Sequence, residues 1–599
     1  KFKSLLDSGL CELIGSGYTQ IIGPLVPHEI HHANLKLGIQ SYEEILRLRP
    51  KVALVNEQAY ALGILDAYID HHFEAIIMEW ENPAQHHPEW NPNFRYYPQI
   101  VRDSQNRPIS LIWNQSIAFQ KFQRYAHHDI ECDEYLKFLG KHVGDANRSF
   151  ALYGNDIEIF DYRPRRYLTE AILKHHHEWE RIETLYTTLK RDTHYTLIKP
   201  SQVLSTAKNI NSHQTLTLGS SLQPIPVKKQ KKYNVTRWAV TGKNDFGINT
   251  LCWKILENLK ATEALSDQNL RELCYLWSSD FRTHITANRW ARYSKRLRLN
   301  QQLTTLQTQA PKKEAKQIST HQPQNYPAQI QRKGRFLTIE TADYRLTLNT
   351  HKGLSIQAFY DKALSDIPLW GTLEHGHYDD ILWSADFYTG HLVLESPGRH
   401  KITDLREIEP TILKQDSKIT VQASIPSPLG EIQKELTFCP QSGAISIAYH
   451  LCWDVIPLGS LRLGYLTLNP AAFDLGSLQY QCHNGGKNLE KIEVKTERID
   501  HSAPVSALIS ASGGLGLTGG TLIMGDKNLE IALRVDKTQG AFIGLIQFEK
   551  FQDTYFFRFI LSAREVDETS RELDTKEIPF PSKLSFTIPP PAKSGHCPP

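Results

Sequence analysis

The stretch from Val52 to Tyr60 reads V-A-L-V-N-E-Q-A-Y, an apolar run that ends at an acid, Glu57. Further along, residues 150–161 read F-A-L-Y-G-N-D-I-E-I-F-D, and Asp156 again follows an apolar run. Short apolar runs of this kind predict buried strands. Acids at the carboxyl ends of buried strands are typical of catalytic (β/α) barrels. The alternative is that Glu57 and Asp156 begin helices, where acids favour the positive end of the helix dipole.

The first 200 residues alternate short apolar runs with amphipathic stretches, which predicts strands separated by helices. The strands are expected at residues 10–14, 52–55, 75–78, 109–113 and 150–153. Polar groups follow several of these runs directly, and they include Glu57, Glu79 and Asn114. This pattern predicts a (β/α) barrel catalytic domain over residues 1–200.

The rest of the chain predicts two further regions and a tail. Residues 201–333 are expected to form a lid or connection followed by a helical bundle. Residues 334–590 alternate apolar and polar side chains between turns, which predicts a large antiparallel β-sandwich. Residues 591–599 are Pro-containing and are expected to be a disordered tail. The fold class is therefore multidomain, α/β plus all-β.

Composition narrows the function classes. The chain has 599 residues and a net charge of +3, without a basic run long enough to follow a phosphate backbone, so nucleic acid is not an expected partner. No apolar stretch approaches the roughly 20 residues that span a membrane. The eight cysteines form no C-x-x-C pair and indicate buried thiols in a reducing, cytoplasmic compartment. The oligomeric state stays open, with a homo-oligomer among the options.

Four segments, in order along residues 1 to roughly 300, together resemble glycoside hydrolase family 57. They are Gly9-Leu10-Cys11-Glu12-Leu13, Leu54-Val55-Asn56-Glu57, Asp156-Ile157-Glu158-Ile159-Phe160-Asp161 and Trp277-Ser278-Ser279-Asp280-Phe281. They are similar to the family's G-Q-L-E-I, W-L-P-E, D-G-E-x-F-G and S-S-D-W motifs. The family's first motif, His-Gln-Pro, has no equivalent, so the resemblance implies an incomplete barrel of the seven-stranded type with a truncated N-terminus.

The resemblance implies a retaining glycosidase or glucanotransferase that acts on α-linked oligo- or polysaccharides. Glu57 would be the nucleophile and Asp156 the general acid and base. Hydrolysis and transfer differ only in the acceptor, and both stay open. The candidate substrate-contacting residues are Glu12, His28, Glu79, Trp80, Trp113, Glu158, Trp277 and Asp280. Core packing, salt bridges and structural roles are the alternatives for these side chains.

The segment His28-Glu29-Ile30-His31-His32 matches H-E-x-x-H, a helical zinc-binding pattern. It follows Pro27 in a stretch without a clear helical pattern, so we expect neither a metal nor another cofactor. Two further hypotheses remain. One is a non-catalytic carbohydrate-binding protein on a glycosidase barrel, and the other is a metal-dependent enzyme that resembles sugar deacetylases.

Overall fold

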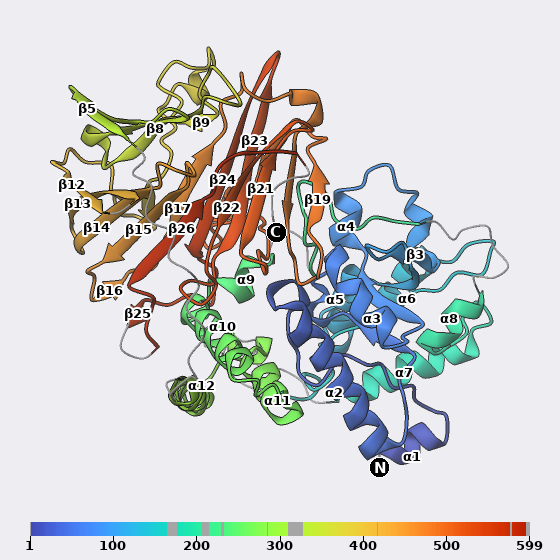
Figure 1. Cartoon of the computed structure of the whole chain (residues 1–599). Helices are drawn as coiled ribbons and strands as arrows, with labels where there is room; N and C mark the ends of the chain where they lie inside the picture. Colours follow the sequence, from blue (N-terminus) through green and yellow to red (C-terminus); the bar gives the residue numbers. More distant parts are fainter. Residues whose placement is uncertain are drawn as a thin grey trace.

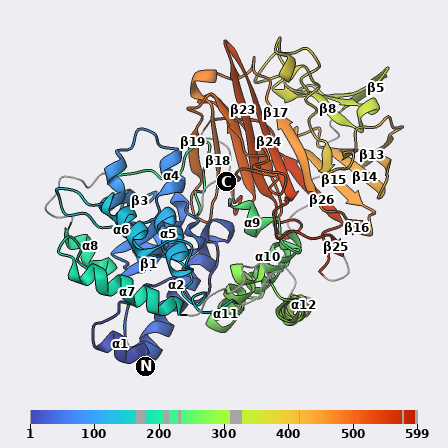
Figure 2. The same ribbon diagram turned by 180° about the vertical axis from the view of Figure 1, so that it is seen from behind.

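The computed structural model describes residues 2–163, 177–206, 215–228, 233–283, 285–308, 327–415, 417–574 and 578–594. It has three parts, which lie side by side in Figures 1 and 2. An N-terminal α/β domain packs against one edge of a large β region, and a helical bundle lies below the junction in Figure 1. Among the described residues, no helix is both long and apolar enough to cross a membrane.

The α/β domain is built on a small sheet with strand order β1-β2-β4-β3. Strands β1 (Val52–Leu54), β2 (Ala75–Glu79) and β4 (Pro108–Asn114) are parallel, and β3 (Gln99–Arg102) pairs antiparallel with β4. The parallel strands are nearly continuous apolar runs because helices cover both faces of the sheet. The described strands form an open four-stranded sheet, so they do not close the expected barrel.

Two helices of this domain precede β1, and the others come between and after the strands. Their bounds are α1 (Phe2–Asp7), α2 (His28–Leu46), α3 (Leu65–Asp70), α4 (Glu81–Gln85), α5 (Ser116–Ala126), α6 (Cys132–Gly140), α7 (Glu178–Arg191) and α8 (Pro200–Thr206). The parallel strands 52–54, 75–79 and 108–114 confirm three of the expected strands. The expected strand at 10–14 is extended chain that ends in a single parallel bridge from Gly15 to Ala53.

The expected strand at residues 150–153 is wrong, because this segment has no strand partner among the described residues. Phe150, Leu152 and Tyr153 pack instead into an aromatic cluster with α5, α6 and α7. The ring centroids of Phe122 and Tyr153 are 5.0 Å apart. An apolar run of four residues can be buried by helices as well as by a sheet, and its periodicity does not distinguish the two. Asp156 therefore follows a loop and not a strand.

The bundle contains α9 (Thr236–Ala239), α10 (Asp245–Ala261), α11 (Asp267–Leu276) and α12 (Ala287–Thr308). Its apolar side chains form a shared core with α2, as the contacts of Ile30 and Leu37 show. The Thr19 hydroxyl donates to the Cys274 carbonyl over 2.8 Å. The bundle is thus joined to the first segment of the α/β domain.

The β region is antiparallel, as expected, and contains two large sheets with one core between them. One sheet has the order β11 (Ile402–Thr403), β10 (Leu392–Glu395), β17 (Ser460–Thr467), β24 (Thr554–Arg564), β23 (Ile543–Phe551) and β20 (Arg498–Asp500). The other has the order β12 (Thr411–Gln415), β13 (Lys418–Ser427), β14 (Gly430–Phe438), β15 (Ile445–Leu451), β26 (Lys583–Ile588), β22 (Leu529–Arg534), β21 (Thr521–Gly525), β18 (Gln479–Cys482) and β19 (Glu490–Glu493).

Smaller sheets complete the β region. One has the order β5 (Gln329–Lys333), β6 (Phe336–Glu340), β7 (Tyr344–Asn349), β8 (Ser355–Asp361) and β9 (Trp370–Gly371), and another pairs β16 (Val455–Ile456) with β25 (Leu573–Asp574). Strand β27 (Ala592–Lys593), inside the expected tail, pairs with β22. Residues 595–599 of that tail lie outside the described residues.

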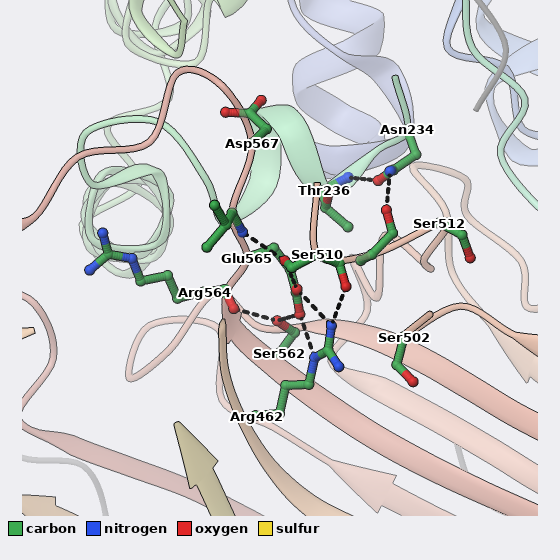
Figure 3. A network of polar contacts seen from close by, with 12 residues as sticks. Asn234, Thr236, Arg462, Ser502, Ser510, Ser512, Ser562, Arg564, Glu565 and Asp567 are labelled. Atoms are coloured by element: carbon green, nitrogen blue, oxygen red, sulfur yellow. Dashed lines mark hydrogen bonds and ion pairs between the residues drawn. The ribbon is translucent and has the colours of Figure 1, made fainter. Parts of the chain in front are cut away.

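A buried polar network joins α9 to the sandwich (Figure 3). The guanidinium of Arg462 donates two 2.8 Å hydrogen bonds to the carboxylate of Glu565. The Ser562 hydroxyl donates to the same carboxylate over 2.7 Å. Next to this group, the Asn234 amide donates to the Ala511 carbonyl over 2.7 Å. The buried charges are paired and hydrogen-bonded, which is what keeps such a group tolerable in a core.

Candidate active site

Glu57 lies in a tight turn directly after β1. The turn is a single 3-10 turn, Asn56–Gln58, in which Glu57 has φ 51° and Gln58 has φ 52°. Left-handed backbone at two successive non-glycine residues costs about 1–3 kcal/mol each, and such conformations cluster at functional sites. The Asn56 amide donates to the Ser16 carbonyl over 2.9 Å and holds the turn in place.

A second chain segment crosses the Glu57 turn. The Lys228 ammonium forms an ion pair with the Glu57 carboxylate. The Lys228 backbone N–H donates to the Glu57 carbonyl over 3.2 Å, and the Tyr60 N–H donates to the Pro226 carbonyl over 2.9 Å. The side chain of Glu57 keeps 17% exposure, so its carboxylate can be reached from solvent.

Asp156 lies in an exposed loop that is tied to the end of β4. The Asn114 amide, at the last residue of β4, donates to the Gly154 carbonyl over 3.2 Å. A Cβ atom at Gly154 would lie 2.4 Å from Asn114 Oδ1, so only glycine fits there without movement. The Tyr153 hydroxyl donates to the Asp156 carbonyl over 2.6 Å. The Asp156 loop is thus anchored at the same edge of the sheet that Glu57 follows, and the two carboxylates make no direct contact within the described residues.

Glu158, in the same loop, has an exposed side chain. Glu79, at the end of β2, is fully buried instead, and its carboxylate accepts from the Asn82 N–H over 2.6 Å. Burial and the hydrogen-bonded Glu81 carboxyl raise the pKa of Glu79 well above its usual value. Glu81 in turn accepts from the Ser116 N–H over 3.0 Å. These two acids connect the strand ends to α4 and α5.

The tryptophans expected near the site form a cluster beside the strand ends. Trp80 and Trp113 are 3% and 4% exposed, and their ring centroids are 5.0 Å apart in an edge-to-face arrangement. Trp90 adjoins both and is stacked on His87 at 4.4 Å. Trp90 is the half-buried member, so it offers more ring surface to a ligand than Trp80 or Trp113.

The remaining candidates lie at junctions between elements. The Glu12 carboxylate accepts from the Ser201 N–H over 3.0 Å, at the start of α8. Trp277 is 3% exposed and packs edge-to-face on Trp253 at 5.8 Å. Asp280 is exposed and accepts from the Ser278 hydroxyl over 3.1 Å.

His28 begins α2, in contact with His32 and Asp66. The segment 28–32 is therefore helical, and the expectation that it lacks a helix is wrong. Pro27 occupies the N-cap position with φ −61°, where the missing N–H of proline removes no helical hydrogen bond. Pro27 thus starts the helix and does not interrupt it.

Residues 1–218 match the model of glycosyl hydrolase family 57. This region is similar to glycosyl hydrolase family 57. The resemblance to family 57 is confirmed over these residues, which supports glycoside hydrolase or transferase chemistry for this part of the chain. No curated protein sequence matches the chain.

Solved structures of low sequence identity resemble this chain. The α-mannosidase from Enterococcus faecalis V583 is 9% identical, with 99% of this chain and 80% of that chain covered and a TM-score of 0.57. The 4-α-glucanotransferase from Thermococcus litoralis is 11% identical, with 98% and 88% covered and a TM-score of 0.38. A branching enzyme from Thermococcus kodakaraensis is 14% identical, with 51% and 67% covered and a TM-score of 0.35. The likeness to the α-mannosidase concerns the fold alone.

Sequence reasoning missed two groups of this candidate site. Lys228 belongs to a run of lysines that indicates a solvated loop, and nothing local marks it as the partner of Glu57. The sequence indicates that Asn114 is a polar group at a strand end. It does not predict that the Asn114 amide bonds to Gly154, which lies 40 residues further along the chain. Such pairings depend on how distant segments pack.

Proposed function

We propose that the chain is a retaining glycosidase or transglycosidase that acts on α-linked glycans, with Glu57 as nucleophile and Asp156 as general acid and base. The observation that carries the proposal is the Glu57 turn, in which a strained, partly exposed carboxylate follows a strand of the region that matches glycosyl hydrolase family 57. The exposed carboxyl of Asp156, on a loop anchored at the same edge, supports the second role.

The proposed reaction has two steps. Glu57 attacks the anomeric carbon and forms a glycosyl-enzyme ester, while the Asp156 carboxyl donates its proton to the departing glycosidic oxygen. Asp156, now ionised, then takes a proton from a water molecule or a sugar hydroxyl, which attacks the ester and releases Glu57. This mechanism requires the two carboxyl groups to come within about 5–5.5 Å of each other when substrate is bound.

Lys228 has a defined part in this scheme. Its ammonium holds one oxygen of the Glu57 carboxylate, so the side chain is oriented before substrate arrives. Orientation of the attacking group lowers the entropic part of the barrier. Lys228 is therefore a positioning residue.

The test compares Glu57→Gln and Asp156→Asn with matched changes at exposed acids of the same domain, Glu44→Gln and Asp145→Asn. Hydrolysis and transfer are measured on α-glucan oligosaccharides and on aryl α-mannosides. We expect each catalytic variant to lose on the order of 10³-fold or more in kcat, and the controls to keep full activity. Full activity of Glu57→Gln on a substrate that the wild type cleaves would refute the assignment.

A covalent intermediate gives a second readout. A 2-deoxy-2-fluoro glycosyl fluoride slows the second step, so the glycosyl-enzyme should accumulate. Mass spectrometry of the digested protein should then find the added sugar on the peptide that carries Glu57. A labelled peptide from another part of the chain would assign the nucleophile elsewhere, and retention of anomeric configuration in the product, followed by NMR, checks the reaction class.

A further inference from the structure

Two histidines on α2 form one face of a side-chain cluster. His28 and His32 are four residues apart, so their side chains lie on the same face of the helix. Their ring centroids are 4.2 Å apart. Paired histidines at this spacing are a frequent arrangement for zinc ligands on helices.

Asp66, on the neighbouring helix α3, supplies a third donor. One carboxylate oxygen lies 3.5 Å from His28 Nδ1, and the other lies 3.8 Å from His32 Nε2. One ligand atom from each of the three residues falls within 4.8 Å of the others. Zinc bound at about 2.0–2.1 Å in a tetrahedral site places its ligand atoms roughly 3.3–3.4 Å apart. Small rotations of the three side chains would therefore meet that geometry.

The two imidazole nitrogens lack hydrogen-bond partners. His28 Nδ1 and His32 Nε2 are shielded from solvent, and neither makes a hydrogen bond within the described part of the chain. Both face the Asp66 carboxylate at 3.5 and 3.8 Å, which is longer than a well-formed hydrogen bond. A bound cation would use both lone pairs at once.

The surroundings favour a small cation over a larger ligand. His71 lies beside His32, with ring centroids 5.5 Å apart, and its Nε2 is likewise buried and not hydrogen-bonded to any described residue. Asp70 is 4.0 Å from His32 Nε2 but is held by Arg107. A water molecule would complete the coordination, since the group of ligand atoms within 4.8 Å of one another contains only His28, His32 and Asp66 among the described residues.

The position of Glu29 argues against peptidase chemistry. In the H-E-x-x-H pattern of metalloproteases, the glutamate acts as the general base beside the zinc. Here the Glu29 carboxylate pairs with Lys260 of α10. The motif therefore supplies ligands without a free base.

We propose that His28, His32 and Asp66 bind a zinc ion that clamps α2 to α3. The proposal uses neither Glu57, Asp156 nor Lys228, so it stands apart from the catalytic assignment, and it gives His28 a metal-binding part in place of the expected substrate contact. Helix α3 begins eight residues after Glu57, so a clamp here would also stiffen the chain that leaves the Glu57 turn. The competing explanation is that a protonated histidine pairs with Asp66 and that no metal binds.

The test measures zinc bound by the purified full chain. The protein is stripped with a chelator, titrated with zinc chloride in competition with a chromophoric chelator, and analysed by elemental mass spectrometry. We expect one zinc per chain for the wild type and for His400→Asn, which changes an exposed histidine in the β region. His32→Asn and Asp66→Asn should each weaken zinc binding by at least about 100-fold.

Cobalt(II) gives an independent signature. A tetrahedral cobalt site absorbs strongly in the visible range, and this absorption should appear in the wild type and disappear in His32→Asn. If His32→Asn fails to fold by circular dichroism, His28→Gln and Asp66→Asn provide the same comparison. Zinc binding below about 0.1 equivalent at micromolar zinc, or equal binding by the wild type and the ligand variants, would overturn the proposal.

Discussion

The Glu57 turn and the Asp156 loop lie at one edge of the same sheet but are held very differently. Glu57 follows β1 directly, in strained backbone, and its turn is bonded to Ser16, Pro226 and Lys228. Asp156 lies in an exposed loop, where Asn114 bonds to the Gly154 carbonyl and Tyr153 bonds to the Asp156 carbonyl. Further along, the Asp161 N–H donates to Glu178. The difference indicates that the proposed nucleophile is fixed in advance, whereas the proposed acid is positioned by a few contacts that single substitutions can remove.

Among changes to the residues around the two acids, Gly154→Ala should lower activity most, because it displaces the less firmly held Asp156 loop. The new Cβ would meet Asn114 Oδ1 at 2.4 Å, so the loop would have to shift and Asp156 would shift with it. A displacement of about 1 Å at a catalytic group can cost on the order of 10²-fold in rate. We expect that loss in kcat with little change in KM, measured by steady-state kinetics on the α-glucan oligosaccharide or aryl α-mannoside that the wild type cleaves.

Gly140→Ala is the matched control, because nothing lies within 4 Å of its added Cβ. It should keep wild-type activity. An unchanged kcat for Gly154→Ala would mean that the position of this loop does not limit the reaction.

A second prediction concerns the more firmly held Glu57 segment, because the chain that follows Glu57 is hydrogen-bonded to the β-sandwich. The Glu490 carboxylate accepts from the Gly63 N–H over 3.0 Å. Burial raises the pKa of Glu490 to about 7. Between about pH 4.5 and 7, the Glu490 carboxyl therefore keeps its proton in the folded protein but has lost it in the unfolded chain. The stability that this proton contributes is full below about pH 4.5 and is lost as pH rises to about 7.

Thermal unfolding of the wild type and Glu490→Gln across this range measures the effect. The amide of the variant does not titrate, so the stability of the wild type relative to the variant should fall by roughly 3 kcal/mol from pH 4.5 to pH 7 and change little above it. Glu44→Gln should run parallel to the wild type. A pH-independent difference between wild type and Glu490→Gln would show that Glu490 does not titrate there.

Lys228→Met should have a smaller effect on the Glu57 side. The variant removes the ion pair, while the backbone bonds of residues 226–228 keep the segment in place. We expect about a tenfold loss in kcat with little change in KM, because the Glu57 carboxylate loses the contact that orients it. Lys137→Met, at an exposed lysine of α6, should change neither quantity.

Tyr153→Phe is the mildest change at the Asp156 loop, and it tests how much one hydrogen bond contributes to the position of Asp156. It removes the hydroxyl that donates to the Asp156 carbonyl and accepts from the Gln123 amide. A neutral hydrogen bond of this kind contributes about 1 kcal/mol, so kcat should fall severalfold. Tyr162→Phe, at an exposed ring two residues past Phe160, serves as the control. A larger loss than in Gly154→Ala would make Tyr153 the main support of the loop.

Local pattern predicted those parts of the fold whose signal lies within a few residues. The runs at 52–55, 75–78 and 109–113 are parallel strands, and the alternation after Gly334 is antiparallel sheet. The position of Glu57 after β1 follows from its own segment in the same way. The prediction of a strand at 150–153 is wrong because the helices α5, α6 and α7 bury its apolar side chains. Nothing in the segment's own sequence indicates these helices.

The sequence by itself determined which segments are apolar, where acids follow them, and that residues 1–218 match the model of glycosyl hydrolase family 57. Tertiary structure alone decided that Lys228 meets Glu57, that Asn114 holds the Gly154 loop, and that Asp66 faces His28 and His32. The physical reason is the separation along the chain between the residues that interact. Periodicity reports which face of an element is buried, whereas a site depends on contacts between elements far apart in the chain, and those contacts are set by packing.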